Sequence, residues 1–269
     1  MEENTVITPE EFDRLHLKNR RRINFIECAI ELYGLISFKD AEELFRKLYN
    51  QRLFTENFSK EIIMALDSFY KNTPKNLEPF IFYDEDSGKV LSAYLDNNSE
   101  RMLLWTVDFE KEFFVSQTLD DYDELLEIQS KYPIYVPDKS NIHLFKGNDK
   151  RVSRFLNDAS NRFVSYLVFT YSMSKRTALE IVKGAIIDSI SCHYVYKRED
   201  LLESIEYRMY AEASIGESKI NKVKELHEEA FEDFYSNLRM WQFCGHTYNE
   251  IRDIKAKNIL LDMIDTNNK

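Results

Sequence analysis

The chain contains few of the residues that interrupt regular secondary structure. Its 269 residues include six glycines and five prolines. TIM barrels, glycine-rich nucleotide-binding folds and β-sandwiches use these residues freely in their many turns. The scarcity therefore argues against those folds and predicts a mostly α (α+β) protein with long helices joined by short polar turns.

Features of secreted and membrane proteins are missing as well. The three cysteines are an odd number spread over a long chain, which does not suit a disulfide framework. No apolar run approaches the roughly 18 residues of a membrane-spanning helix, and the opening MEENTVITPEEFD has no apolar core of a signal peptide. We therefore expect a cytoplasmic protein with reduced thiols and no membrane partner.

No sequence motif in the chain indicates a reaction that the protein could catalyse. The phosphate-binding and nucleophile patterns G-x-x-x-x-G-K, G-x-G-x-x-G and G-x-S-x-G do not occur. Cysteine and histidine are paired at Cys192-His193 and again at Cys244 and His246, but neither pair reproduces a C-x-x-C knuckle. Adjacent residues on a helix also point about 100° apart, which is poor geometry for one zinc ion. The expectation is no enzymatic activity, no metal and no cofactor.

The net charge of −11 is distributed unevenly along the chain. Residues 14–76 hold 12 Lys or Arg against 8 Asp or Glu, whereas residues 77–136 hold 4 bases against 14 acids. The basic run lies between Arg14 and Arg22. Repulsion of polyanions should therefore be strongest at the acidic stretch, and a nucleic acid would have to approach the N-terminal part.

The N-terminal part has the order of a winged helix-turn-helix domain, with bounds of about 14–100. Apolar positions recur at helical spacing over 23–33, 41–49 and 62–70, and the pattern then alternates over 80–83 and 90–95. Gly34 is placed to end the first helix, and Ser37 and Ser59 to cap the next two. This order predicts three helices followed by a β-hairpin wing, with the basic run just before the first helix.

The remaining chain predicts an acidic connecting segment, 101–137, and an α-helical domain, 138–263. Two prolines in Tyr132–Pro137 disfavour helix there. Helical patterns follow over 152–167, 178–190, 201–209 and 220–243, the second capped by Ser174. Trp241 is expected on the buried face of the longest helix, which Gly245 should end. Thr247 and Glu250 form a T-x-x-E capping box for a last helix.

Two segments of this chain resemble a known family. YPIYVPDKSNIHLF at 132–145 and SNLRMWQFCGHTYNEI at 236–251 are similar to segments of bacterial proteins that combine an N-terminal winged-helix-like region with a C-terminal SEC-C zinc motif. Tyr248 stands where that family usually has proline, and no C-x-C or C-x-x-C follows Cys244. The resemblance therefore implies architecture, without the zinc motif and without an activity.

The first hypothesis for function is a regulatory protein that acts by protein–protein docking. The 16 Tyr and 19 Phe suit anchored interfaces, although a large aromatic core explains them equally well. A sharper form is an acidic inhibitor of a nucleic-acid enzyme of a bacterial defence system, like the anti-CRISPR proteins that phages encode. Its partner-binding residues would be the two acidic clusters Asp84, Glu85, Asp86 and Asp120, Asp121, Asp123. A homodimer is a further candidate assembly.

The second hypothesis is a winged-helix transcriptional regulator that binds DNA. Its candidate nucleic-acid-binding residues are Arg20, Arg21, Arg22, Lys60 and Lys71. Two features weigh against it, because Glu61 and Asp67 oppose the lysines of the third helix, and the expected wing tip at 84–86 carries three acids.

Overall fold

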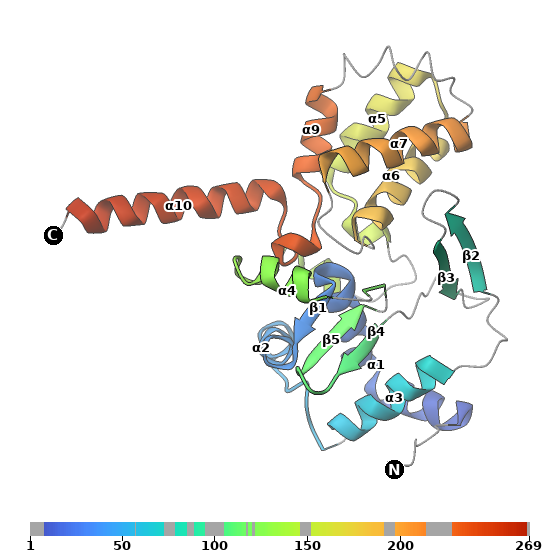
Figure 1. Cartoon of the computed structure of the whole chain (residues 1–269), viewed down its shortest axis with the longest axis vertical. Helices are drawn as coiled ribbons and strands as arrows, with labels where there is room; N and C mark the ends of the chain where they lie inside the picture. Colours follow the sequence, from blue (N-terminus) through green and yellow to red (C-terminus); the bar gives the residue numbers. More distant parts are fainter. Residues whose placement is uncertain are drawn as a thin grey trace. The chain divides into compact units, whose positions relative to one another are not determined.

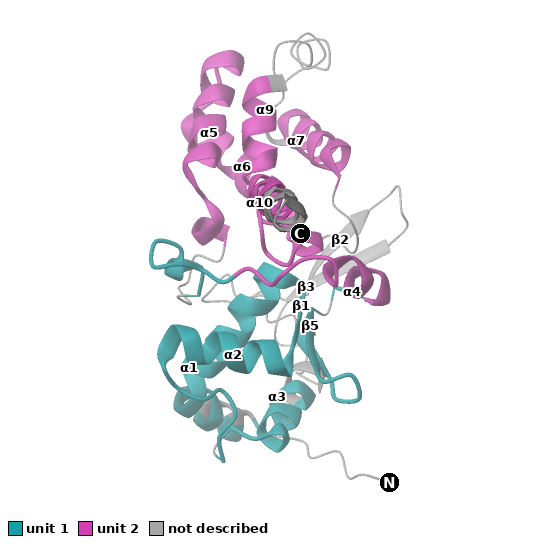
Figure 2. Ribbon diagram, turned by 90° about the vertical axis from the view of Figure 1, so that its left-hand side faces the viewer, with its two compact units in different colours: residues 1–119, 136–151 teal, residues 120–135, 152–269 magenta. Residues whose placement is uncertain are grey.

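The computed structural model describes residues 8–56, 58–72, 79–84, 89–94, 105–116, 118–119, 122–145, 152–190, 197–213 and 228–267. These residues fall into two compact units, which are coloured in Figure 2. Unit 1 consists of residues 1–119 and 136–151, and unit 2 of residues 120–135 and 152–269. The stretch 101–137, which the sequence suggested as a connector, is thus shared between the two units.

Unit 1 begins with a long helix, a short strand and two further helices: α1 (Pro9–Tyr33), β1 (Leu35–Ser37), α2 (Phe38–Tyr49) and α3 (Lys60–Asn72). Gly34 follows α1 with φ 75°, and Ser37 caps α2 by accepting from the Asp40 amide, as the sequence predicted. The start of α1 was predicted too late. Because the Thr8 hydroxyl accepts from the Glu11 amide and Pro9 opens the helix, the basic run at 14–22 lies inside α1.

Two antiparallel sheets occur in the described part of unit 1. The strands β2 (Pro79–Asp84) and β3 (Lys89–Tyr94) pair with each other, which confirms the hairpin predicted at 80–95. The other sheet has the order β1-β5-β4 and contains β4 (Trp105–Asp108) and β5 (Phe113–Ser116) (Figure 1). The hairpin that pairs with β1 is therefore 105–116, in the stretch that the sequence analysis assigned to an acidic connector.

Aromatic side chains fill the core of unit 1. The Phe25 ring stacks on Phe145 with centroids 5.4 Å apart and meets Phe45 edge-on at 5.0 Å. The Tyr49 hydroxyl donates to the Phe145 carbonyl over 3.0 Å. The 3-10 turn η1 (Ile142–Phe145) is thereby fixed in the core of unit 1, although it follows the segment 120–135, which belongs to unit 2.

Unit 2 is helical in its described part. Its elements are α4 (Asp123–Gln129), η2 (Val152–Phe155), α5 (Asp158–Tyr171), α6 (Lys175–Ser189), α7 (Arg198–Ala213), α9 (Glu228–Ser236), η3 (Trp241–Phe243) and α10 (Tyr248–Asn267). Ser174 caps α6 as predicted, and Asn157 caps α5. Together the two units contain more helix than any other structure among the described residues, which confirms a mostly α (α+β) protein.

The long helix predicted at 220–243 is wrong at its C-terminal end. The α-helix α9 ends at Ser236, and a turn then leads into η3. The Asn237 side chain donates to the Asp233 carbonyl over 2.7 Å and so replaces the next helical hydrogen bond. Trp241 is buried, with 3% of its surface exposed, but it lies on η3 rather than on an α-helix. Residues 220–227 lie outside the described part.

Helices α6 and α7 approach closely at a glycine. The guanidinium of Arg208 on α7 covers Gly184 on α6, so that a Cβ atom at Gly184 would overlap it. The same guanidinium donates to the Asp188 carboxylate, with both distances 3.1 Å. The two helices can approach closely because Gly184 has no side chain, and the ion pair between Arg208 and Asp188 joins them at the same place. None of the helices in the described residues is long and apolar enough to cross a membrane.

Candidate functional sites

The three arginines proposed for nucleic-acid contact have different environments on α1. Arg20 and Arg21 are exposed, and the Arg21 guanidinium lies 5.9 Å from the centre of the Tyr49 ring. Arg22 is half-buried and donates to the carbonyls of Leu53 and Arg52, at 3.0 and 3.3 Å. Arg22 therefore holds the loop after α2, and the exposed cations of the trio are Arg20 and Arg21.

Helix α3 presents few cationic groups on its described surface. Lys60 forms an ion pair with Glu112 and also lies 5.3 Å from the centre of the Phe38 ring. Glu61 and Met64 are exposed, Met64 to 48% of its surface. Asp67 is buried. The side chain of the other proposed lysine, Lys71, lies outside the described part of the chain.

The turn between β4 and β5 is acidic and exposed. Glu110, Lys111 and Glu112 are all exposed, and the Asp108 carboxylate accepts from the Lys111 amide over 2.9 Å. Because Glu112 forms an ion pair with Lys60, the turn neutralises the charge of the lysine at the start of α3. A phosphate backbone would meet net negative charge at this position.

The acidic residues proposed for partner binding belong to two different units. Asp84 ends β2 in unit 1, and Asp123 is exposed at the start of α4 in unit 2. The side chain of Asp84 is outside the described part, as are Glu85, Asp86, Asp120 and Asp121. In the described chain the acidity of this second group continues along α4, where Glu124 and Glu127 are also exposed.

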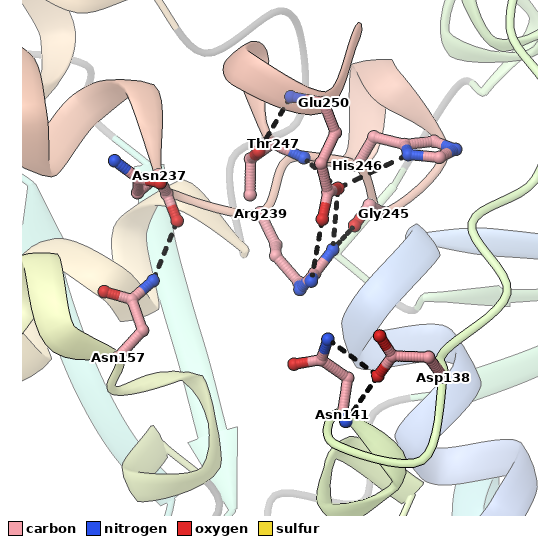
Figure 3. Close-up of polar contacts among 9 residues, drawn as sticks. All are labelled: Asp138, Asn141, Asn157, Asn237, Arg239, Gly245, His246, Thr247 and Glu250. Carbon is pink, nitrogen blue, oxygen red and sulfur yellow. Dashed lines mark hydrogen bonds and ion pairs between the residues drawn. The ribbon is translucent and has the colours of Figure 1, made fainter. Parts of the chain in front are cut away.

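A buried polar cluster in unit 2, which the sequence analysis revealed only in part, is centred on Arg239 (Figure 3). Its Nη1 donates to the Gly245 carbonyl over 2.8 Å and to Glu250 over 3.1 Å, and its Nη2 donates to Glu250 over 3.2 Å. The guanidinium carbon lies 3.8 Å from the centre of the Tyr135 ring. Only 12% of the Arg239 side chain is exposed. Arg239 thus closes the turn from α9 to α10 by a bidentate ion pair and a cation–π contact.

Glu250 is held in its ionised form by its neighbours. Burial by itself would raise the pKa of this carboxyl. The His246 imidazole, whose Nδ1 lies 3.4 Å from Glu250 Oε2, the Arg239 charge and the Thr247 amide lower the pKa to about 2. The Thr247 amide donates to Glu250 over 3.0 Å, and the Glu250 amide donates to the Thr247 hydroxyl over 3.2 Å. These two bonds form the capping box that the sequence predicted at the start of α10.

The segment 129–135 completes this corner of unit 2. The Gln129 side chain donates to the Trp241 carbonyl over 2.6 Å, and the Tyr135 amide donates to the Cys244 carbonyl over 3.0 Å. Cys244 and Gly245 have φ of 51° and 79°. Because Cys244 has a left-handed backbone conformation, the chain turns here and its carbonyls lie within hydrogen-bonding distance of Gln129 and Tyr135. Residues 132–135 and 236–251 therefore meet in one corner of unit 2.

The chemistry of the Arg239 cluster is that of a structural site. Arginine and glutamate satisfy each other there, and the remaining hydrogen bonds go to backbone groups of the same turn. Among the residues that the structure describes, no group of three or more His, Cys, Asp and Glu could hold a metal ion. Cys192 and His193 lie outside the described residues.

The role of Arg239 was not predictable from local spacing, because Glu250 follows it by 11 residues and Tyr135 precedes it by 104. The signal in the sequence was the T-x-x-E pattern, which located Glu250 but not its partner.

No family model matches this chain, and no curated protein and no solved structure matches it either. Its function is therefore inferred from the geometry of the described residues.

Proposed function

We propose that the protein is a non-enzymatic interaction protein and that unit 1 is a winged-helix domain which docks onto another protein. The order α1-β1-α2-α3, with the hairpin β4–β5 that follows β2 and β3 along the chain, supports the fold assignment. So does the antiparallel order β1-β5-β4, in which the last strand lies between the other two. The wing is then β4–β5 and not the hairpin at 80–95 that the sequence indicated. In this assignment α3 is the recognition helix and the turn 109–112 is the wing.

The composition of the exposed face of α3 carries the docking proposal. A helix that reads DNA presents Arg, Lys, Asn or Gln to base edges from its N-terminal turns. In α3 the first lysine is paired with Glu112, and the exposed positions that follow are Glu61 and Met64. Methionine adapts its shape to protein surfaces. An acidic wing beside an exposed methionine favours a protein partner over a phosphate backbone.

The polar cluster in unit 2 supports the non-enzymatic part of the proposal. A catalytic acid, base or nucleophile needs a reactive group directed at a substrate. Arg239 and Glu250 are instead engaged with each other and with the turn that they close. Their arrangement is that of a pair which positions α10.

Site-specific cross-linking tests the docking surface. A photoreactive amino acid replaces Met64 on α3, and in a matched control it replaces Arg46, which is exposed on α2 of the same unit. In the cells that make this protein, we expect a discrete protein adduct from position 64 and none from position 46. Adducts that are equal at both positions, or absent at both, would refute docking through α3.

A second candidate function, DNA binding, is favoured by one observation. Arg20 and Arg21 are exposed side by side on α1. Fluorescence anisotropy with duplex DNA separates the candidates, because phosphate contacts weaken steeply between about 50 and 200 mM salt. If the protein binds DNA, the anisotropy of a labelled duplex rises at low salt. The double variant Arg20→Glu, Arg21→Glu should abolish this rise, whereas the control double variant Arg46→Glu, Lys47→Glu should keep it. If the protein docks onto another protein instead, the anisotropy of the duplex should not rise even at low salt.

A further inference from the structure

Helix α7 of unit 2 has one outward face. The exposed positions among its described side chains are Glu199, Asp200, Glu203, Tyr207, Tyr210 and Ala211. At 100° per residue, these six positions fall within about 120° of the helix circumference. The opposite side lies in the core, where Leu201, Ile205 and Met209 are at most 3% exposed. The outward face of α7 therefore takes no part in the packing of unit 2.

Two tyrosines contribute most of the area of this face. Tyr207 and Tyr210 expose 72% and 65% of their surface. Their spacing of three residues places them side by side on the helix, and Glu203 is the neighbour of Tyr207 at a spacing of four. Tyrosine is enriched at protein interfaces and among the residues that contribute most to binding. The outward face of α7 therefore has the composition of a binding surface.

The charge of the outward face has one sign. The exposed charges on the described part of α7 are all carboxylates. Both arginines of α7 are engaged with other helices, because Arg208 forms an ion pair with Asp188 on α6 and Arg198 forms one with Glu232 on α9. A nucleic acid would be repelled by this face, whereas a cationic segment would be attracted to it. Charge complementarity therefore selects a basic partner.

Unit 2 itself shows how a ring and a carboxylate together hold an arginine. The Arg239 guanidinium lies 3.8 Å from the centre of the Tyr135 ring and donates to Glu250. The Arg198 guanidinium lies 5.1 Å from the centre of a phenylalanine ring on α9 and forms an ion pair with the carboxylate that follows in sequence. Both contacts combine a cation–π interaction with an ion pair. The outward face of α7 presents the same two kinds of group to solvent.

We propose that the outward face of α7 binds an arginine-rich segment of another protein. From residue 199 to residue 210 the face is about 16 Å long at 1.5 Å per residue, which matches about five residues of extended chain. Its carboxylates pair with the guanidinium groups, and its tyrosine rings stack on them. Arginine fits better than lysine, because a planar guanidinium stacks on aromatic rings and is more weakly hydrated. The proposal does not depend on docking through α3, because α7 belongs to unit 2.

Fluorescence anisotropy with the full chain tests the role of the tyrosines. The probe is a short labelled peptide in which arginine alternates with serine, and its counterpart carries lysine in place of arginine. We expect the arginine peptide to bind more tightly. Tyr207→Ala with Tyr210→Ala should weaken its binding about tenfold. Phe169→Ala, which removes an exposed ring from α5 of the same unit, should leave binding unchanged.

Circular dichroism and the urea midpoint show whether the tyrosine variant keeps its fold, as expected for exposed side chains. The proposal is overturned if the arginine peptide does not bind, if the lysine peptide binds equally well, or if the folded variant binds like the parent. Sedimentation velocity of the same proteins tests the other occupant. A variant that loses self-association but still binds the peptide would show that a second copy covers this face, and would also overturn the proposal.

Removal of carboxylates tests the role of charge. Glu199→Gln with Glu203→Gln should weaken binding of the arginine peptide about fivefold at low salt. The matched control, Glu229→Gln with Asp253→Asn, removes the same charge from exposed positions on α9 and α10 of unit 2. We expect the control to bind like the parent. Equal losses in the two double variants would show that the peptide responds only to net charge, which would contradict a site on α7.

Discussion

Replacing Arg239 with methionine should destabilise unit 2 by removing one partner of a partly buried ion pair. Methionine keeps an unbranched apolar chain against Tyr135 but loses the donors to Gly245 and Glu250. Removing one member of a buried ion pair leaves the other charge without its partner, which costs about 3 to 5 kcal/mol. The Glu250 side chain is 35% exposed, so water partly replaces Arg239. We therefore expect a loss of about 2 kcal/mol in the free energy of unfolding.

The same substitution should change the response of the protein to acid. The pKa of Glu250, about 2 in the folded chain, lies below its ordinary value of 4.5. The stabilisation is therefore complete above pH 4.5 and is lost as the pH falls from 4.5 toward 2. Without the Arg239 charge the pKa of Glu250 rises toward its ordinary value. The difference between parent and Arg239→Met should consequently be largest at neutral pH and smallest near pH 2.

Urea unfolding followed by fluorescence measures this difference when parent and variant both carry Trp105→Phe, because Trp241 is then the remaining tryptophan. Trp241 reports on unit 2, and its carbonyl accepts from Gln129 beside the Arg239 turn. Arg176→Met is the matched control, because Arg176 is an exposed arginine on α6 of the same unit. The reasoning is refuted if R239M unfolds at the same urea concentration as the control at pH 7. It is also refuted if the loss is the same at pH 7 and near pH 2.

Three further predictions concern other parts of the chain. Gly184→Leu should lower the free energy of unfolding by about 1 to 2 kcal/mol, since the larger side chain displaces the Arg208 guanidinium and breaks its ion pair with Asp188, which outweighs the gain of about 1 kcal/mol from removing a helical glycine. Unchanged thermal unfolding would contradict the α6–α7 contact. Trp241→Ala should cost about 3 to 5 kcal/mol, the usual range for a buried large aromatic, and a variant as stable as the parent in urea would show that Trp241 is not part of the core. Neutralising Asp123, Glu124 and Glu127 to Asn and Gln should slow association with the protein captured through Met64 at low salt, and leave stability unchanged. An association rate that ignores both the substitutions and the salt would mean that this acidity has no part in docking.

Local signals predicted the ends of several helices correctly. Ser37, Ser174 and Thr247 each accept from a backbone amide three residues later, as their positions before apolar helical patterns indicated. These interactions occur within one turn of chain and are therefore visible in a short window of sequence. The same holds for Gly34, whose φ of 75° suits the residue that follows a helix.

Non-local interactions account for what the sequence did not predict. Strand β4 contains only Trp105–Asp108, and its buried residues are Trp105 and Val107. Two apolar positions separated by one residue are too few to distinguish a strand from the start of a helix. The strand is defined by its pairing with β5, and β5 in turn pairs with β1, nearly 80 residues earlier in the chain. Sequence periodicity carries no information about such pairing.

The end of α9 was missed for a related reason. Leu238 and Trp241 continue the apolar spacing of the helix beyond Ser236, and both are buried. They reach the core from a turn and from η3, because Arg239 pairs with Thr247 in an isolated antiparallel bridge and turns the chain. A buried residue at helical spacing is therefore compatible with either structure.

The interleaving of the two units has a consequence for how the protein is synthesised. Unit 1 is incomplete when residue 119 has been made, because η1 supplies Phe145 to the ring stack with Phe25. The ribosome must first add the segment 120–135, whose own unit is completed only by residues after 151. At about 5 to 20 residues per second, the core of unit 1 therefore stays incomplete for roughly 2 to 6 seconds during synthesis. A fragment that stops at residue 119 would keep this nascent state permanently, whereas one that ends after residue 151 contains every part of unit 1.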